Sequence, residues 1–207
     1  MNEAKRRLGY LGQYIGLRLI LIGCRRHRHG SLELYANDAD EGQAPLWLEK
    51  VSRALSLIEA FQPSVYRRMG TDVDRILVDR IRGPMYYAPG RVVWLHGPGL
   101  HNAEVEAVAG MLVHEATHAR IATNRIRYSR EVRARHELAC VKAEVRYAMR
   151  IGRTDLAERA VAKLDEPWWS DEDLKKRALA EFDRLGLGGP VGRLLRHKVE
   201  RSYPPHE

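Results

Sequence analysis

The chain contains little cysteine: Cys24 and Cys140 are the only two among 207 residues. They lie far apart in the sequence, and two cysteines do not make a disulfide framework. No CxxC pair is present, which excludes a zinc ribbon. We therefore expect reduced thiols and a cytoplasmic location, where disulfides are rare.

The sequence also lacks an uninterrupted hydrophobic run of the length that a transmembrane helix needs. The apolar stretch 8–23 is interrupted by Gln13 and Arg18, and the basic cluster 25–29 follows at once, which is untypical of a secretory signal. We expect residues 8–23 to form an amphipathic helix that packs on the domain or touches a membrane surface. An alternative stays open, because residues 21–24 resemble a lipoprotein processing box that ends at Cys24.

The composition is that of a soluble globular protein, with 44% hydrophobic and 30% charged residues, and the length suffices for one well-packed domain. The polar stretch 36–43 predicts a loop, so we assign residues 1–43 to an N-terminal segment and residues 44–207 to a single domain. The formal net charge of +8 favours contact with anionic surfaces, acidic substrates or nucleic acid.

Hydrophobic periodicity and turn residues predict helices, then a small sheet, then helices again. The first helix begins at Pro45, is broken at Pro63 and continues to Met69. Strands are expected at 75–81, 85–87 and 91–95, with a turn at 97–99. Further helices are expected at 103–123 and 129–150, from Thr154, from Ser170 and after Pro190. This order predicts an α+β domain.

Residues 114–118 have the sequence His-Glu-Ala-Thr-His, the HExxH pattern. Side chains four residues apart share one face of a helix, so the imidazoles of His114 and His118 can bind one Zn²⁺ ion. Glu115 is rotated aside by roughly 100°, so its carboxylate misses the metal but can reach a water bound to it. Zinc lowers the pKa of such a water, and Glu115 would take its proton and later deliver it to the leaving group.

The surrounding helix distinguishes this interpretation from a chance pattern on a surface helix. Between residues 103 and 113 the only charged side chains are Glu104 and Glu106, in the first turn, where the helix dipole favours them. A helix that is apolar all round is buried, and imidazoles and carboxylates in a buried helix need partners. The sequence therefore predicts a buried zinc site.

The motif resembles that of the zincin metallopeptidases, over residues 75–144 and most strongly at 114–118. The metzincin extension is absent, because Ile121 and Asn124 occupy positions where that pattern has a glycine and a histidine. The layout is thus similar to that of the gluzincins, which implies a glutamate from the following helix as the third zinc ligand. The resemblance further implies a small sheet whose edge strand holds an extended substrate beside the cleft. We expect residues 91–95, the last strand before the motif helix, to form that edge.

A projection of the helix 129–150 favours Glu137 as the third ligand over three other candidates, Glu131, His136 and Glu144. Glu137 and Glu144 fall in the middle of the apolar side, which also carries Ala134, whereas Glu131 and His136 fall on its flanks. A carboxylate in the middle of that side is costly unless it meets a cation or a metal. Glu137 follows His118 by 19 residues, which is enough to finish one helix and bring the next alongside. Glu144 is roughly 10 Å further along the axis. It could orient a ligand histidine through its free ring N–H, or pair with an arginine. The alternative is that both glutamates make ordinary buried ion pairs.

Two other residues lie in or between these predicted helices. Tyr128 is a candidate for stabilising the oxyanion, with simple packing at the helix junction as the alternative. Cys140 is interpreted as a small buried apolar residue.

Together the residues predict a zinc-dependent hydrolase, a metallopeptidase that cleaves amide bonds in a peptide or protein substrate. One alternative is a specialised hydrolase of another amide. Another is a non-enzymatic zinc-containing protein that binds nucleic acid or an anionic surface. Structural zinc sites are closed by four protein ligands, and Glu115 would have no role in one, so the enzyme is favoured.

Overall fold

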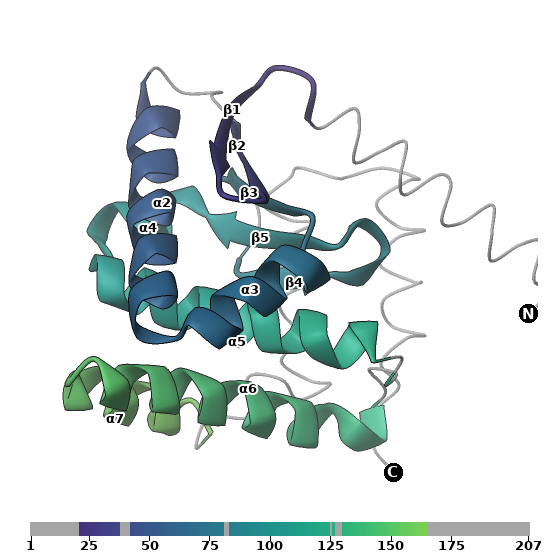
Figure 1. The fold of residues 1–207 in the computed structure, drawn as a ribbon, viewed down its shortest axis with the longest axis vertical. Coiled ribbons are helices and arrows are strands. Elements are labelled where there is room, and N and C mark those ends of the chain that lie inside the picture. Colours follow the sequence, from purple (N-terminus) through teal and green to yellow (C-terminus); the bar gives the residue numbers. More distant parts are fainter. Residues whose placement is uncertain (1–20, 38–41, 81–82, 125, 127–129, 165–207) are drawn as a thin grey trace, which may run out of the picture. The chain divides into compact units, whose positions relative to one another are not determined.

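The strands form one mixed sheet in a computed structural model that describes residues 21–37, 42–80, 83–124, 126 and 130–164 (Figure 1). The sheet has five strands in the order β1-β2-β3-β5-β4. Their bounds are β1 (Cys24–His29), β2 (Leu32–Asn37), β3 (Arg75–Asp79), β4 (Met85–Tyr87) and β5 (Val92–His96). Strands β2, β3 and β5 run parallel, and the edge strands β1 and β4 pair antiparallel with their neighbours. Six helices accompany the sheet in the described part of the chain, which confirms the α+β class.

Strands β1 and β2 are not among the elements that the sequence predicts. They are joined through Gly30, whose φ of 56° lies in the left-handed region that favours glycine. Along β2, buried Leu32, Leu34 and Ala36 alternate with half-buried residues, the period of a strand with one face on a core. Strand β1 is exposed over most of its length, so its basic residues show no such alternation. Residues 24–37 thus contribute two strands to the sheet.

Most of the predicted helices lie where the sequence places them. Their bounds are α2 (Gln43–Phe61), α3 (Pro63–Asp72), α4 (Gly97–Asn102), α5 (Val105–Thr123), α6 (Arg130–Arg150) and α7 (Thr154–Ala162). The short helix α4 replaces the turn predicted at 97–99. Lys50 of α2 donates hydrogen bonds to the backbone oxygens of Leu100, His101 and Ala103, at 2.7, 2.9 and 3.0 Å. A cation at these carbonyls stabilises the end of α4, just before α5 begins.

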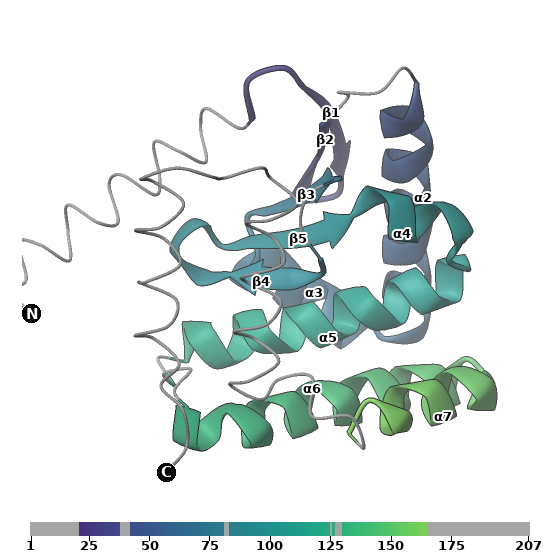
Figure 2. The same cartoon turned by 180° about the vertical axis from the view of Figure 1, so that it is seen from behind.

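Helices α2 and α5 pack against one face of the sheet, α3 contacts both of them, and α6 packs along α5 (Figures 1 and 2). The main core joins apolar side chains of the inner strands, such as Leu34, Ile76 and Val93, to those of α2 and α5. Helix α5 therefore has the sheet on one side and α6 on another. This position explains why its sequence is apolar almost all round.

Contacts divide the chain into residues 1–160 and 161–207, a boundary that falls inside the range 44–207 assigned above to one domain. The helices predicted from Ser170 and after Pro190, nearly all of the stretch 8–23, and Tyr128 lie outside the described residues. Among the helices that the structure describes, none combines the length and the apolar character needed to cross a membrane.

Candidate metal centre

The HExxH residues lie in the buried middle of α5. His114 and Glu115 are each only 5% exposed, so the motif is not on a surface helix. The rings of His114 and His118 are one turn apart, with their centroids 5.1 Å from each other. Both imidazoles reach toward α6, as the helical spacing predicts.

Glu137 of α6 meets both imidazoles. Its Oε2 atom lies 3.4 Å from His114 Nε2 and 3.5 Å from His118 Nε2, and its side chain is 3% exposed. Two ligands of a tetrahedral zinc with bonds of 2.0–2.1 Å are separated by about 3.3 Å. Each of the two nitrogen–oxygen distances is thus close to the separation expected between two ligands of one such ion.

Glu144 contacts the other ring nitrogen of His114. Its Oε2 lies 3.3 Å from His114 Nδ1. Gly110 lies about one turn before His114 on α5. A Cβ atom on Gly110 would be 3.4 Å from Glu144 Cγ, an ordinary contact, so only a side chain larger than that of alanine would displace Glu144. A carboxylate on the second nitrogen of a histidine fixes the tautomer and orientation of the ring, leaving Nε2 free to bind a metal.

The charges around His114 are strong enough to reverse the effect of burial. Burial alone would lower the pKa of His114, but hydrogen bonds with Glu137 and Glu144 outweigh it and raise the pKa to about 9. Such a concentration of carboxylates on a buried imidazole has the electrostatic character of a cation site. A metal ion would take the place of the proton, since a ligand histidine must be neutral.

Cys140 also belongs to this cluster, a role that its sequence context does not predict. Its Sγ and one ring nitrogen each of His114 and His118 all lie within 4.8 Å of one another, so the three residues can hold a metal ion. Burial, followed by the nearby charge of Glu137, raises the pKa of the Cys140 thiol. Interpreting Cys140 as merely a small apolar residue was therefore incomplete. Its spacing of three residues from Glu137, on the same face of α6, is the signal that could have identified it.

Two α6 side chains thus compete for the role of third ligand. Cys140 completes the compact group with the histidines, whereas Glu137 makes the short contacts to both Nε2 atoms. The contacts of Glu137 are the stronger geometric argument, because they converge on a single oxygen atom at the spacing of a tetrahedral site. A thiol and a carboxylate beside two imidazoles form a donor set that suits zinc.

Glu115 lies beside this cluster and also reaches β4 at the edge of the sheet. It accepts a hydrogen bond from the backbone of Tyr86 in β4, and its Oε2 is buried without a hydrogen-bond partner in the described part of the chain. Burial raises the pKa of Glu115, against the opposing influence of His114 and His118. A buried carboxylate with a raised pKa and one unused oxygen is suited to proton transfer.

The strand beside the motif is β4, and the expectation that residues 91–95 form this edge is wrong. Strand β5 lies between β3 and β4, inside the sheet. The chain turns back after β4 and inserts β5 next to β3, so the last strand before α5 is not the outer one. The outer side of β4 has no neighbouring strand in the described sheet.

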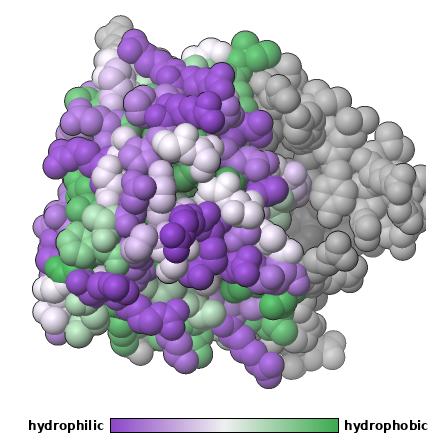
Figure 3. All heavy atoms as spheres, viewed as in Figure 1, coloured by the Kyte–Doolittle hydropathy of each residue, from purple (hydrophilic) through white to green (hydrophobic). Residues whose placement is uncertain are grey.

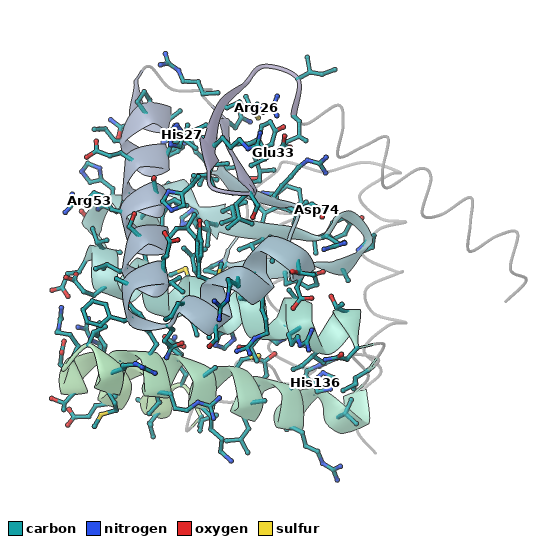
Figure 4. All side chains as sticks on the ribbon, viewed as in Figure 1. Arg26, His27, Glu33, Arg53, Asp74 and His136 are labelled. Carbon is teal, nitrogen blue, oxygen red and sulfur yellow. The ribbon has the colours of Figure 1, made fainter. Side chains whose placement is uncertain are left out.

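His136 is buried beside the cluster, although the helix projection placed it on the flank of the apolar side. It is 6% exposed and lies toward the N-terminal end of α6 (Figure 4). Burial, and then the charge of His118, lowers its pKa. Ala134, by contrast, is exposed although the projection put it on the buried side, so the face of α6 that packs on α5 begins only near His136.

Comparison of the chain with protein-family models, with curated proteins and with solved structures found no match.

Proposed function

We propose that the protein is a zinc-dependent hydrolase that cleaves an amide bond, with a peptide or protein as its substrate. One observation carries the proposal: a single oxygen of Glu137 meets both motif histidines at 3.4 and 3.5 Å. This arrangement brings together residues 19 or more positions apart, which a chance HExxH pattern would not require. His114, His118 and Glu137 would hold the ion, and Glu144 would orient His114.

A zinc ion in this position would polarise the substrate carbonyl and lower the pKa of a water molecule. The protein supplies the base. Glu115 Oε2 takes the proton of the attacking water and passes it to the nitrogen of the leaving amine. The raised pKa of Glu115 makes its carboxylate a stronger base than an ordinary surface carboxylate, which favours the first half of this transfer.

The position of β4 favours an extended peptide as the substrate. This strand is at the sheet edge and contacts α5 where the Tyr86 backbone reaches Glu115. A peptide segment can add to such an edge through backbone hydrogen bonds, which would place its carbonyls along the motif helix. Because backbone groups supply these bonds, the bonds do not select the sequence of the peptide. Contacts between the peptide's side chains and neighbouring residues of the protein would set that preference.

The variant Glu115→Gln tests the proposal. We expect it to keep its metal, as measured by elemental analysis of the purified protein, and to lose about 100- to 10,000-fold in turnover on a peptide library. Glu106→Gln is the matched control, because Glu106 is on the same helix, about two turns before the motif, and pairs with Arg153 at 4.0 Å. Loss of zinc in Glu115→Gln, or turnover equal to that of the control, would contradict the assigned role.

A second function is favoured by Cys140: a non-enzymatic protein that keeps zinc for its structure. Two histidines, Glu137 and Cys140 would supply four ligands and close the site to substrate. Under this alternative Cys140→Ala loses the metal, and the native protein hydrolyses no member of the peptide library. Under the hydrolase proposal Cys140→Ala keeps both its metal and its activity.

A further inference from the structure

A second polar site lies apart from the histidine cluster. A pocket of about 590 Å³ is lined by residues of α3, α5 and α6, together with Gln62 before α3. Its charged residues are Asp72 and four arginines, Arg68, Arg120, Arg146 and Arg150. Hydrophilic side chains predominate on the face of the molecule that carries α3 and α6 (Figure 3).

The arginines of this pocket are poorly neutralised. Arg120 Nη1 lies 3.7 Å from Asp72 Oδ2. Asp72 is only 1% exposed, so Arg120 forms an ion pair with a buried carboxylate. For Arg68, Arg146 and Arg150, no ion pair is found within the described ranges of the chain. Arg146 and Arg150 are also four residues apart on α6, a spacing at which like charges destabilise a helix. An anion in the pocket would relieve this repulsion.

The pocket is distinct from the metal centre. Its wall on α5 consists of Val113, Ala116, Thr117 and Arg120, a set with helical spacing on one face. His114 and His118 are turned from the centre of that face by roughly 110° and 150°. None of the residues placed in the metal centre lines the pocket. A ligand here would therefore not contact the proposed zinc ligands directly.

We propose that this pocket binds a small phosphate-bearing molecule. The guanidinium group presents a rigid fork of donors that matches phosphate oxygens, and a phosphate has enough oxygens and charge to pair with several arginines at once. The volume lies in the range of small-molecule sites, which favours a compact ligand over a long nucleic-acid strand. The proposal does not depend on the protein being a hydrolase.

Calorimetric titration of the full chain with inorganic pyrophosphate tests the proposal, with citrate as the carboxylate comparison. We expect saturable binding of pyrophosphate that Arg146→Gln and Arg68→Gln each weaken by about tenfold. Arg135→Gln is the matched control, since Arg135 is exposed on the same helix, does not line the pocket and is about 16 Å from Arg146 along the axis. The control should bind like the native protein.

The titration is repeated after a chelator has removed bound metal, because phosphates also bind zinc. Binding that persists after chelation and is weakened by Arg146→Gln supports the pocket. Binding that disappears with the metal, or is equal in Arg146→Gln and Arg135→Gln, overturns the proposal. Citrate binding as tightly as pyrophosphate would overturn the preference for phosphate. A single-stranded oligonucleotide that binds through Arg146 and is not displaced by pyrophosphate would overturn the choice of a small ligand.

Discussion

Replacing Glu137 by alanine tests which side chain of α6 completes the metal site. The carboxylate is buried, and its Oε2 lies 3.4 and 3.5 Å from the two motif nitrogens, so the substitution removes a proposed ligand and leaves a gap that water would fill. Loss of an outer carboxylate that only orients a ligand costs about 10- to 100-fold in metal affinity. Loss of a direct ligand should exceed that range, so we expect zinc binding to weaken by more than about 100-fold, or about 2.7 kcal/mol.

The assay is competition with a fluorescent zinc chelator at fixed pH, with circular dichroism to verify that the variant is folded. Cys140→Ala serves as the paired variant, because Cys140 is three residues further along the same face and equally buried. We expect it to keep near-native affinity. Native affinity in Glu137→Ala together with loss in Cys140→Ala would refute the reasoning and transfer the role to the thiol. Loss in both variants would indicate four protein ligands, as in a structural site.

Other predictions concern the surroundings of the site. Glu144→Gln is expected to weaken zinc binding by about 10- to 100-fold in the same competition assay, because His114 loses the acceptor for its Nδ1; unchanged affinity would refute this role. Gly110→Ala should be tolerated, whereas Gly110→Leu should displace Glu144 and reduce metal content, as elemental analysis would show; normal metal content in the leucine variant would count against close α5–α6 packing. Lys50→Met should lower the free energy of unfolding in urea by about 1.5–3 kcal/mol, since three carbonyls lose a charged donor. Removal of the metal by a chelator should lower the melting temperature, because an ion bound only by the folded state stabilises it; no shift in a calorimetric scan would argue against a bound metal.

The histidine cluster shows which features of the site can be predicted from the helical periodicity of the sequence. The spacing of His114 and His118 on one face, and the burial of Glu137 and Glu144 on α6, follow from 3.6 residues per turn. The position of Glu144 on the second nitrogen of His114 also agrees with the role that the sequence predicts for it. The same periodicity could not place the end of the buried face of α6, so it misjudged Ala134 and His136.

The sheet illustrates the opposite limit. The sequence predicts three strands at their observed positions, but it does not reveal that β5 inserts between β3 and β4. Strand order depends on pairing between segments and not on the pattern within each strand. Strand β1 is not predicted from the sequence because an exposed edge strand needs no apolar alternation. Strand β2 does have such an alternation, at Leu32, Leu34 and Ala36.

The sequence by itself therefore determined the described helices other than α4, three of the strands, the paired imidazoles of α5 and the two buried carboxylates of α6, since each depends on neighbours a few residues away. Only the tertiary structure brought Glu137 to both histidines, added Cys140 to the cluster and made β4 the edge beside Glu115. The arginine pocket likewise exists only where α3, α5 and α6 meet. The physical reason is that contacts between distant segments are set by how whole helices and strands pack, and no local period encodes that packing.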